Sequence, residues 1–145
     1  ASDVYKRQLL LLADEQESMI DLYLERGEMF ALYDQNILKT ICVVTDEGGK
    51  TIELKNIATD PQYQKQGYGK RLIRFISEHY AGKYDTLLVG TGESPLTIPF
   101  YAQNGFKYSH RIKDFFTDNY DHPIYEDGKQ LVDMVYLRKE LSKSK

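Results

Sequence analysis

The feature that most constrains the fold is a glycine-containing loop between a strand-like run and an amphipathic helix-like run. Residues 51–59, TIELKNIAT, have the alternation of a strand, and residues 70–80, KRLIRFISEHY, repeat apolar side chains at helical spacing. Between them lies DPQYQKQGYG, residues 60–69, with Gly67 and Gly69 directly before the helix. Because glycine has no Cβ, backbone N–H groups at such a helix start can approach an anion closely. The segment therefore predicts either a plain turn or a phosphate-binding loop.

The common nucleotide-binding motifs do not fit this loop. The string G-x-x-x-x-G-K-[S/T] of a P-loop does not occur in the sequence. The dinucleotide fingerprint G-x-G-x-x-G would need a glycine where Leu72 stands, and the later GTG at 90–92 fails because Pro95 takes the third position. The segment 62–74 nevertheless holds four basic residues and no acid, namely Lys65, Lys70, Arg71 and Arg74. The pattern favours a diphosphate ligand outside the nucleotide-binding folds.

Composition and charge limit the remaining classes of protein. The chain has 145 residues, which suits one domain over residues 1–145. Its formal net charge of −3 argues against general nucleic-acid binding, and no apolar run has membrane-spanning length. The lone Cys42 lies in an apolar strand-like run, which excludes an internal disulfide framework and predicts a cytoplasmic protein. His79, His110 and His122 are too scattered to predict a metal site.

The remaining elements predict a mixed-sheet α/β domain with a parallel step across the 70–80 helix. Pro99 indicates that the second short helix begins late or is kinked, and Ser94 is its candidate N-cap. In chain order we expect a helix at 14–27, three antiparallel strands over 28–59, the 70–80 helix, a buried strand at 85–92, a short helix within 94–106, a strand at 106–112, a long loop at 113–128 and a strand at 130–141.

Two strings together resemble a known family. QKQGYG, residues 64–69, resembles motif A (Q/R-x-x-G-x-G/A) of the GNAT N-acetyltransferase superfamily, and it follows a strand as it does there. PFYAQNGF, residues 99–106, resembles the end of motif B, with Tyr101 four residues before a Gly-Phe pair. The resemblance covers nearly the whole chain. It implies a GNAT-like fold with a central, mostly antiparallel sheet of about six to seven strands, one parallel step and flanking helices.

The resemblance also implies acetyl-CoA as cosubstrate and names the residues that would hold it. The end of the strand, Ile57, Ala58 and Thr59, would pair with the pantetheine arm through backbone groups. Ser94 stands where the family often has an asparagine that contacts this arm. Arg71 and Lys65 are either contacts of the adenosine 3′-phosphate or part of a solvated basic face. The diphosphate cradle would comprise Gln64, Lys65, Gln66, Gly67, Tyr68, Gly69 and Lys70.

Two catalytic residues follow from the same resemblance. Tyr101 occupies the position of the general acid, although a core tyrosine is the alternative. Glu53 occupies the position of a glutamate base, with a surface pair to Lys55 or a water held by Asn56 as alternatives. Simple alternation predicts Glu53, Lys55 and Ile57 on one face of the strand, and Ile52, Leu54 and Asn56 on the other.

The resulting prediction is an acetyl-CoA-dependent N-acetyltransferase that acts by direct transfer to a primary amine of a small molecule or peptide. The alternative is a non-catalytic acyl-CoA sensor or interaction module on the same fold. No nucleic acid, membrane or metal is expected as a partner. The acidic and aromatic segment 113–128 suits a cationic amine, a solvated surface loop or the contact of a homodimer.

Overall fold

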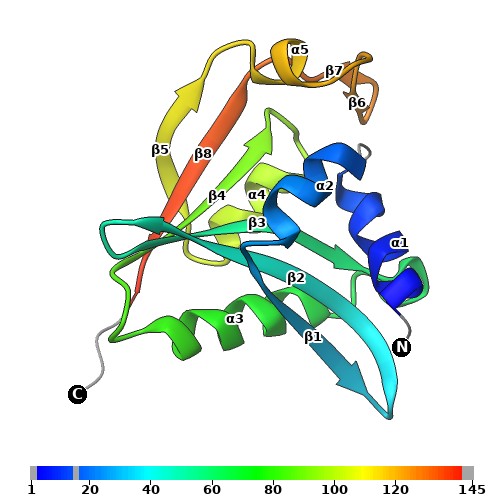
Figure 1. The fold of residues 1–145 in the computed structure, drawn as a ribbon, viewed down its shortest axis with the longest axis vertical. Coiled ribbons are helices and arrows are strands. Elements are labelled where there is room, and N and C mark those ends of the chain that lie inside the picture. The colour runs from blue at the N-terminus through cyan, green and yellow to red at the C-terminus, as the bar shows by residue number, and fades with distance from the viewer. Residues whose placement is uncertain (1–2, 15–16, 142–145) are drawn as a thin grey trace.

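The computed structural model describes residues 3–14 and 17–141, which form a twisted six-stranded sheet with helices on both faces (Figure 1). The strand order is β1-β2-β3-β4-β8-β5, and a two-stranded sheet, β6-β7, lies apart from it. The helices are α1 (Asp3–Ala13), α2 (Glu17–Leu24), α3 (Tyr68–Tyr80), α4 (Thr97–Gln103) and α5 (Phe115–Asn119), with a 3₁₀ turn, η1, at Pro61–Tyr63. The strands are β1 (Glu28–Asp34), β2 (Ile37–Gly48), β3 (Thr51–Thr59), β4 (Thr86–Gly92), β5 (Lys107–Ile112), β6 (Tyr125–Glu126), β7 (Lys129–Gln130) and β8 (Met134–Glu140).

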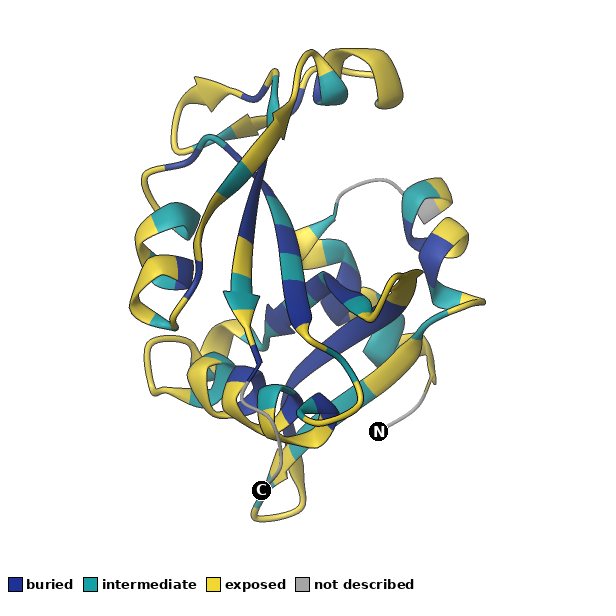
Figure 2. Ribbon diagram, turned by 90° about the vertical axis from the view of Figure 1, so that its left-hand side faces the viewer, coloured by how far each residue is buried: buried dark blue, intermediate teal, exposed yellow. Residues whose placement is uncertain are grey.

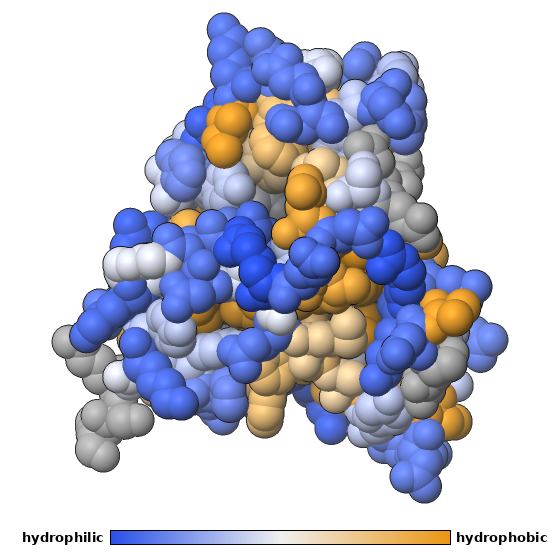
Figure 3. Space-filling model, viewed as in Figure 1, coloured by the Kyte–Doolittle hydropathy of each residue, from blue (hydrophilic) through white to orange (hydrophobic). Residues whose placement is uncertain are grey.

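The predicted mixed sheet is confirmed. All neighbouring strands of the main sheet pair antiparallel except β3 and β4, which are parallel and joined through α3. Figure 2 shows that buried residues concentrate along the central strands and on the inner sides of the helices. β1 forms one edge of the sheet. On the face drawn in Figure 3, polar side chains cover most of the surface and apolar ones gather over β1.

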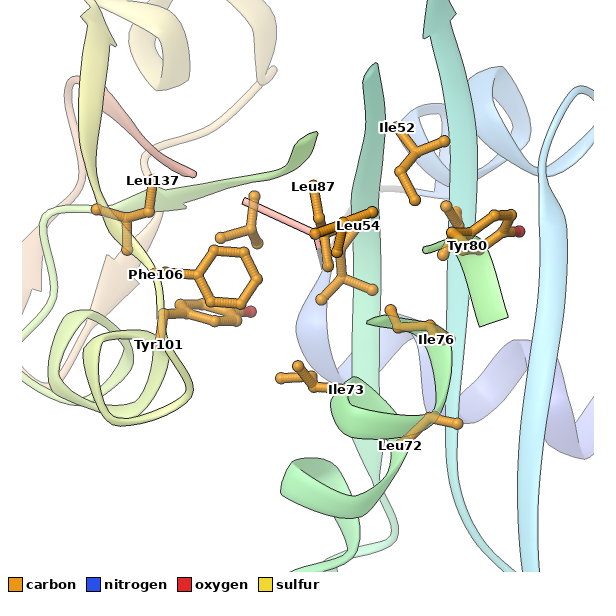
Figure 4. Packing of buried hydrophobic residues seen from close by; sticks show 14 of the residues in the cluster. Ile52, Leu54, Leu72, Ile73, Ile76, Tyr80, Leu87, Tyr101, Phe106 and Leu137 are labelled. Carbon is orange, nitrogen blue, oxygen red and sulfur yellow. The ribbon is translucent and has the colours of Figure 1, made fainter. Parts of the chain in front are cut away.

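The larger core lies between the sheet and the α3–α4 face (Figure 4). The helical spacing of Leu72, Ile73, Ile76 and Tyr80 puts all four on one side of α3, where each is almost fully buried. They pack with strand residues that include Ile52, Leu54, Leu87 and Val89. Burial of such side chains contributes about 1.5–3 kcal/mol each, so this stripe holds α3, and with it the loop before it, firmly on the sheet.

A second core on the opposite face corrects the prediction for the N-terminal region. In place of one helix at 14–27, two helices cover this face, α1 and the shorter α2; residues 15 and 16 of the predicted helix lie outside the described ranges. Leu9 and Leu10 of α1 and Ile20 of α2 pack against β2 and β3. No helix in the described ranges has the length and apolar character needed to cross a bilayer.

A β-bulge in β3 overturns the predicted strand faces. On β2, Val43 pairs with Asn56 while the next residue, Val44, pairs with Leu54, so Lys55 is the extra residue. The alternation therefore shifts by one at Lys55. The Asn56 side chain forms a hydrogen bond with α1, on the face covered by α1 and α2. The Ile57 side chain packs on the opposite face, in the core that includes α3. Placing Asn56 with Ile52 and Leu54, and Ile57 with Glu53, was wrong for this reason.

The C-terminal third also differs in part from expectation. The predicted loop 113–128 contains α5 and strand β6, and β7 follows directly. Phe116 anchors this region by packing with Ile124 and Leu131 in a small third core. α4 begins only at Thr97, after Leu96 as N-cap rather than Ser94. Pro99 therefore lies in the first turn, where its missing N–H costs no hydrogen bond.

Candidate active site

The cleft opens where β3 and β4 separate. The two strands pair only from Thr51 to Leu54 with Thr86 to Val89; beyond these residues β3 continues alongside β2, and β4 continues alongside β8. The bulge at Lys55 lies at this point, and bulges bend and twist a strand. The resulting cleft has a volume of about 420 Å³. It is lined by Ile57, Thr59, Tyr63, Gln64, Lys65, Gly67, Tyr68, Gly69, Lys70, Leu96, Thr97, Phe100 and Tyr101.

The loop between β3 and α3 forms one wall and presents an open helix N-terminus. Gly67 is the N-cap of α3 with a φ of 87°, a left-handed conformation that favours glycine, and no side chain caps the first turn. Lys65 also has a positive φ, 64°. The first N–H groups of a helix have no intrahelical partner, and the helix dipole makes them attractive to anions. Together with the ammonium groups of Lys65 and Lys70, this end of the cleft suits an anionic group.

The base of the loop is held by short-range hydrogen bonds. Asp60 Oδ1 accepts the N–H of Gln62 at 2.9 Å and so caps the 3₁₀ turn. The Gln64 amide donates to the carbonyl oxygen of Thr59 at 3.2 Å. Gly69 lies beside α4, where a Cβ would be in ordinary van der Waals contact with the Phe100 ring at 3.4 Å. Of the two glycines, only Gly67 has a backbone conformation that favours glycine.

One edge of β3 is free beside this loop. Residues 56–59 pair with β2 on one side, and within the described part of the chain no strand of the sheet pairs with them on the other. The side chains of Ile57 and Thr59 line the cleft, whereas Ala58 points into the α1–α2 core. Such an edge can pair with an extended ligand through backbone N–H and C=O groups.

Tyr101 of α4 forms part of the opposite wall. Its ring packs edge-to-face against Phe106, with centroids 5.5 Å apart, and Figure 4 shows its hydroxyl directed toward the sheet and α3. The side chain is buried yet lines the cleft. Burial raises the pKa of the phenol well above its ordinary value, and the nearby Glu126 carboxylate raises it further. Tyr101 therefore keeps its proton across the whole neutral range.

Glu53 lies on the other face of β3, away from α3. Its Oε2 contacts Lys55 Nζ at 3.1 Å and accepts the Tyr136 hydroxyl at 3.3 Å. Burial raises the pKa of the Glu53 carboxyl, while the Lys55 ammonium opposes that shift. Both partners contact Oε2, so Oε1 has no hydrogen-bond donor among the described residues. Glu53 is not among the residues that line the cleft.

Three further residues with predicted contacts lie outside the cleft lining. The Ser94 hydroxyl is buried and donates to Glu126 Oε1 at 2.9 Å, and it accepts the N–H of Leu96 at 3.1 Å. Gln66 lies in the loop but does not line the cleft. Arg71 lies 3.9 Å from Asp34 and over the Tyr68 ring, on the outer side of α3. The assigned roles of all predicted site residues remain predictions.

Sequence reasoning missed part of the lining. Thr97 and Phe100 share the face of α4 that carries Tyr101, which their spacing of three and four residues could have shown. Tyr63 also lines the cleft, from the 3₁₀ turn. Within the described ranges, no three histidine, cysteine or acidic side chains come together in a way that could hold a metal ion.

Comparisons with known proteins agree with this geometry. A model of the acetyltransferase (GNAT) domain family matches residues 25–108. The uncharacterized N-acetyltransferase YvbK of Bacillus subtilis (strain 168) is 38% identical over 136 residues, which cover 92% of this chain and 87% of that protein.

Solved structures show the same fold. An acetyltransferase from Bacillus subtilis, solved in complex with CoA, has a TM-score of 0.89 at 35% identity over 97% of this chain and 94% of its own. A GNAT family acetyltransferase from Elizabethkingia anophelis, solved with acetyl-CoA bound, has a TM-score of 0.88 at 34% identity over 97% and 92%. Since the family model covers more than half of the chain and the relatives extend over nearly all of it, this chain belongs to the GNAT family of acetyltransferases.

Proposed function

We propose that this protein transfers the acetyl group of acetyl-CoA directly to a primary amine of a small molecule or peptide. The observation that carries the proposal is that one cleft combines an uncapped helix N-terminus, a free strand edge and the hydroxyl of a buried tyrosine. Those three features match the three parts of the cosubstrate, which are a diphosphate, an amide-containing arm and a thioester.

The residues present fit acetyl-CoA. Backbone N–H groups around Gly67, with Lys65 and Lys70, would hold the diphosphate. The free edge at Ile57 to Thr59 would pair with the amides of the pantetheine arm. A volume of about 420 Å³ falls within the usual range of ligand sites. When bound, acetyl-CoA supplies an activated acetyl group, and the protein's part is to orient it and to move protons.

Tyr101 would protonate the leaving sulfur. A free thiol has a pKa of about 8.5 and a free phenol one of about 10, so a tyrosine is protonated at neutral pH and can still supply a proton to a thiolate. Burial raises the pKa of Tyr101 further, which keeps the acid form fully populated. Phe100 and Phe106 pack edge-to-face against its ring, with centroids 5.2 and 5.5 Å away, and so fix the direction of the hydroxyl.

Glu53 would accept the proton of the incoming amine, because an alkylammonium with a pKa of about 10.4 is not nucleophilic at pH 7. The amine would approach from the face of β3 that carries Glu53, while the cosubstrate lies in the cleft beyond the separated strands. The raised pKa of Glu53 makes it a stronger base than an exposed carboxylate. The alternative base is a water oriented by Asn56. Only the Oδ1 atom of Asn56 is available to hold that water. The Asn56 amide N–H group donates to Leu10 O and Tyr23 Oη, both at 2.9 Å.

A sensor on the same fold is the second candidate. The observation in its favour is that Glu53 lies outside the cleft lining, with one oxygen engaged by both Lys55 and Tyr136. A sensor would bind acyl-CoA in the same cleft and would release no thiol.

Calorimetric titration of acetyl-CoA, followed by an assay of thiol release against a panel of amines, separates the candidates. Micromolar binding with thiol release for any amine supports the transferase, and Tyr101→Phe then serves as the matched control with an intact cleft. Binding without release for any amine favours the sensor. Absence of binding contradicts both.

A further inference from the structure

A buried lysine lies beneath the loop between β3 and α3. Lys39 of β2 is only 6% exposed, and its Nζ lies 3.3 Å from the centroid of the Tyr63 ring and 5.7 Å from that of Tyr68. The two rings meet edge-to-face at an interplanar angle of 88°. Both tyrosines line the cleft, whereas Lys39 does not. Any effect of Lys39 on a ligand therefore passes through the two rings or through its electric field.

The backbone of Lys39 supports the same loop. Its carbonyl oxygen accepts the N–H of Asp60 at 2.9 Å, at the point where β3 ends and the loop begins. Asp60 in turn caps the 3₁₀ turn that carries Tyr63. Tyr68, the first residue of α3, is held from its other end by a 2.9 Å hydrogen bond from its hydroxyl to Asp34. One residue thus contacts the loop at its start, in its middle and at the beginning of the helix.

The charge of Lys39 is not balanced by a carboxylate. Its ammonium forms no ion pair with any of the described residues. Even partial withdrawal of an ammonium group from water has a cost unless the group is paired. Attraction to the faces of tyrosine rings offsets part of that cost. An anion bound at the loop above the rings would offset more of it, and this charge balance points to a ligand with phosphate groups.

We propose that Lys39 is a positioning residue for the diphosphate of acetyl-CoA. Its ammonium holds the rings of Tyr63 and Tyr68 in the cleft wall and adds positive potential beneath the loop that carries Gly67. The inference rests on the acetyl-CoA site of the proposed function. The proposal predicts that Lys39 contributes to phosphate binding alone. The pantetheine arm would lie along β3 and would not contact the ring faces on which the ammonium lies.

The test compares two ligands in Lys39→Met and Lys39→Arg. Calorimetry measures the Kd for CoA, and a ¹⁵N NMR titration measures the weaker Kd for S-acetylpantetheine, which lacks the diphosphate together with the 3′-phosphorylated adenosine. In Lys39→Met we expect CoA binding to weaken by about five- to tenfold, in line with loss of a partly buried cation–π contact, with S-acetylpantetheine binding unchanged. Lys39→Arg keeps the charge and stacks on aromatic rings, so it should recover most of the CoA affinity.

Lys83→Met is the matched control. It removes the same charge from an exposed position just past the C-terminal end of α3, whereas the cleft lies at the N-terminal end. The helix between them is about 20 Å long, so the control should bind CoA like the wild type. If Lys39→Met does not fold, as its NMR spectrum would show, Tyr63→Leu takes its place and should show the same loss for CoA only.

Three results would overturn the proposal: wild-type CoA affinity in Lys39→Met, an equal loss for both ligands, or an equal loss in Lys83→Met. The calorimetry needs no acceptor amine. Absence of turnover in the wild type would therefore contradict the transferase and leave the test of Lys39 intact. Failure of the wild type to bind CoA would contradict the site itself.

Discussion

A carboxylate at position 67 should block the anion site through its charge rather than its size. Gly67 has a φ of 87°, and a Cβ built there would have no atom within 4 Å. Any side chain introduced at position 67 therefore causes backbone strain but no steric clash. This strain costs roughly 1–2 kcal/mol for most L-residues and less for asparagine and aspartate. Gly67→Asn and Gly67→Asp experience this strain alike and have nearly the same shape. They differ by one negative charge.

The expected difference follows from Coulomb's law. For a carboxylate about 5 Å from one phosphate charge, the repulsion is about 1 kcal/mol at the dielectric constant of water and about 3 kcal/mol at an effective value of 20. The open cleft places the real value between these limits. We therefore expect Gly67→Asp to bind CoA about five- to a hundredfold more weakly than Gly67→Asn, and added salt should reduce the difference.

Calorimetric titration of CoA into both variants, at low and high salt, measures this difference directly. Thermal unfolding of the two proteins serves as the control, because similar midpoints show that the backbone strain is shared. Equal CoA affinities for the two variants would refute the diphosphate cradle at the start of α3. A large loss in both, with no difference between them, would show that backbone conformation matters there and charge does not.

Tyr101→Phe should lower kcat by roughly 100-fold while calorimetry shows nearly unchanged CoA affinity; unchanged thiol release would remove its role as acid. Burial raises the pKa of the Glu53 carboxyl, so the folded state binds the carboxyl proton more tightly than the unfolded state does. Ionisation of Glu53 therefore destabilises the folded state as the pH rises through the raised pKa. Thermal unfolding should therefore show Glu53→Gln more stable than wild type at pH 8, with the gap narrowing toward pH 4; a gap that widens as pH falls contradicts this sign. Asn56→Asp places a carboxylate oxygen against the carbonyl of Leu10 in place of two donated hydrogen bonds. It should lower the free energy of unfolding by about 3 kcal/mol, and urea unfolding that matches wild type would show that α1 is held by other contacts.

Helices and strands with strong local periodicity were predictable from sequence. The stripe of α3 and the apolar run of β4 are such cases, and both are confirmed close to their expected bounds. α5 and the β6–β7 hairpin, with five and two residues per element, are too short to show a period. Tertiary packing of Phe116 determines the placement of α5. α1 was missed because its run of leucines has no regular polar face; Leu10 is buried while Leu12 is exposed.

The family and the cosubstrate were also predictable, because both depend on short contiguous strings. QKQGYG and the PFYAQNGF segment carry the resemblance to GNAT proteins, and the family match and the YvbK relative confirm it. Loop amides bind phosphate through backbone groups, so the pattern of glycines alone is informative. No such contiguous string indicates the acceptor, and for that reason the sequence does not identify it.

The order of the main elements, the parallel step and the loop at the start of α3 could all be predicted from the sequence, since each depends on neighbours along the chain. Three features depend on tertiary contacts instead: the bulge at Lys55 that exchanges the faces of Asn56 and Ile57, the place of Glu53 across the sheet from Tyr101, and the position of Lys39 under Tyr63. A bulge is a mismatch between two strands, and the other two are distances between residues far apart in sequence. Such features exist only once the sheet has paired and the helices have packed on it.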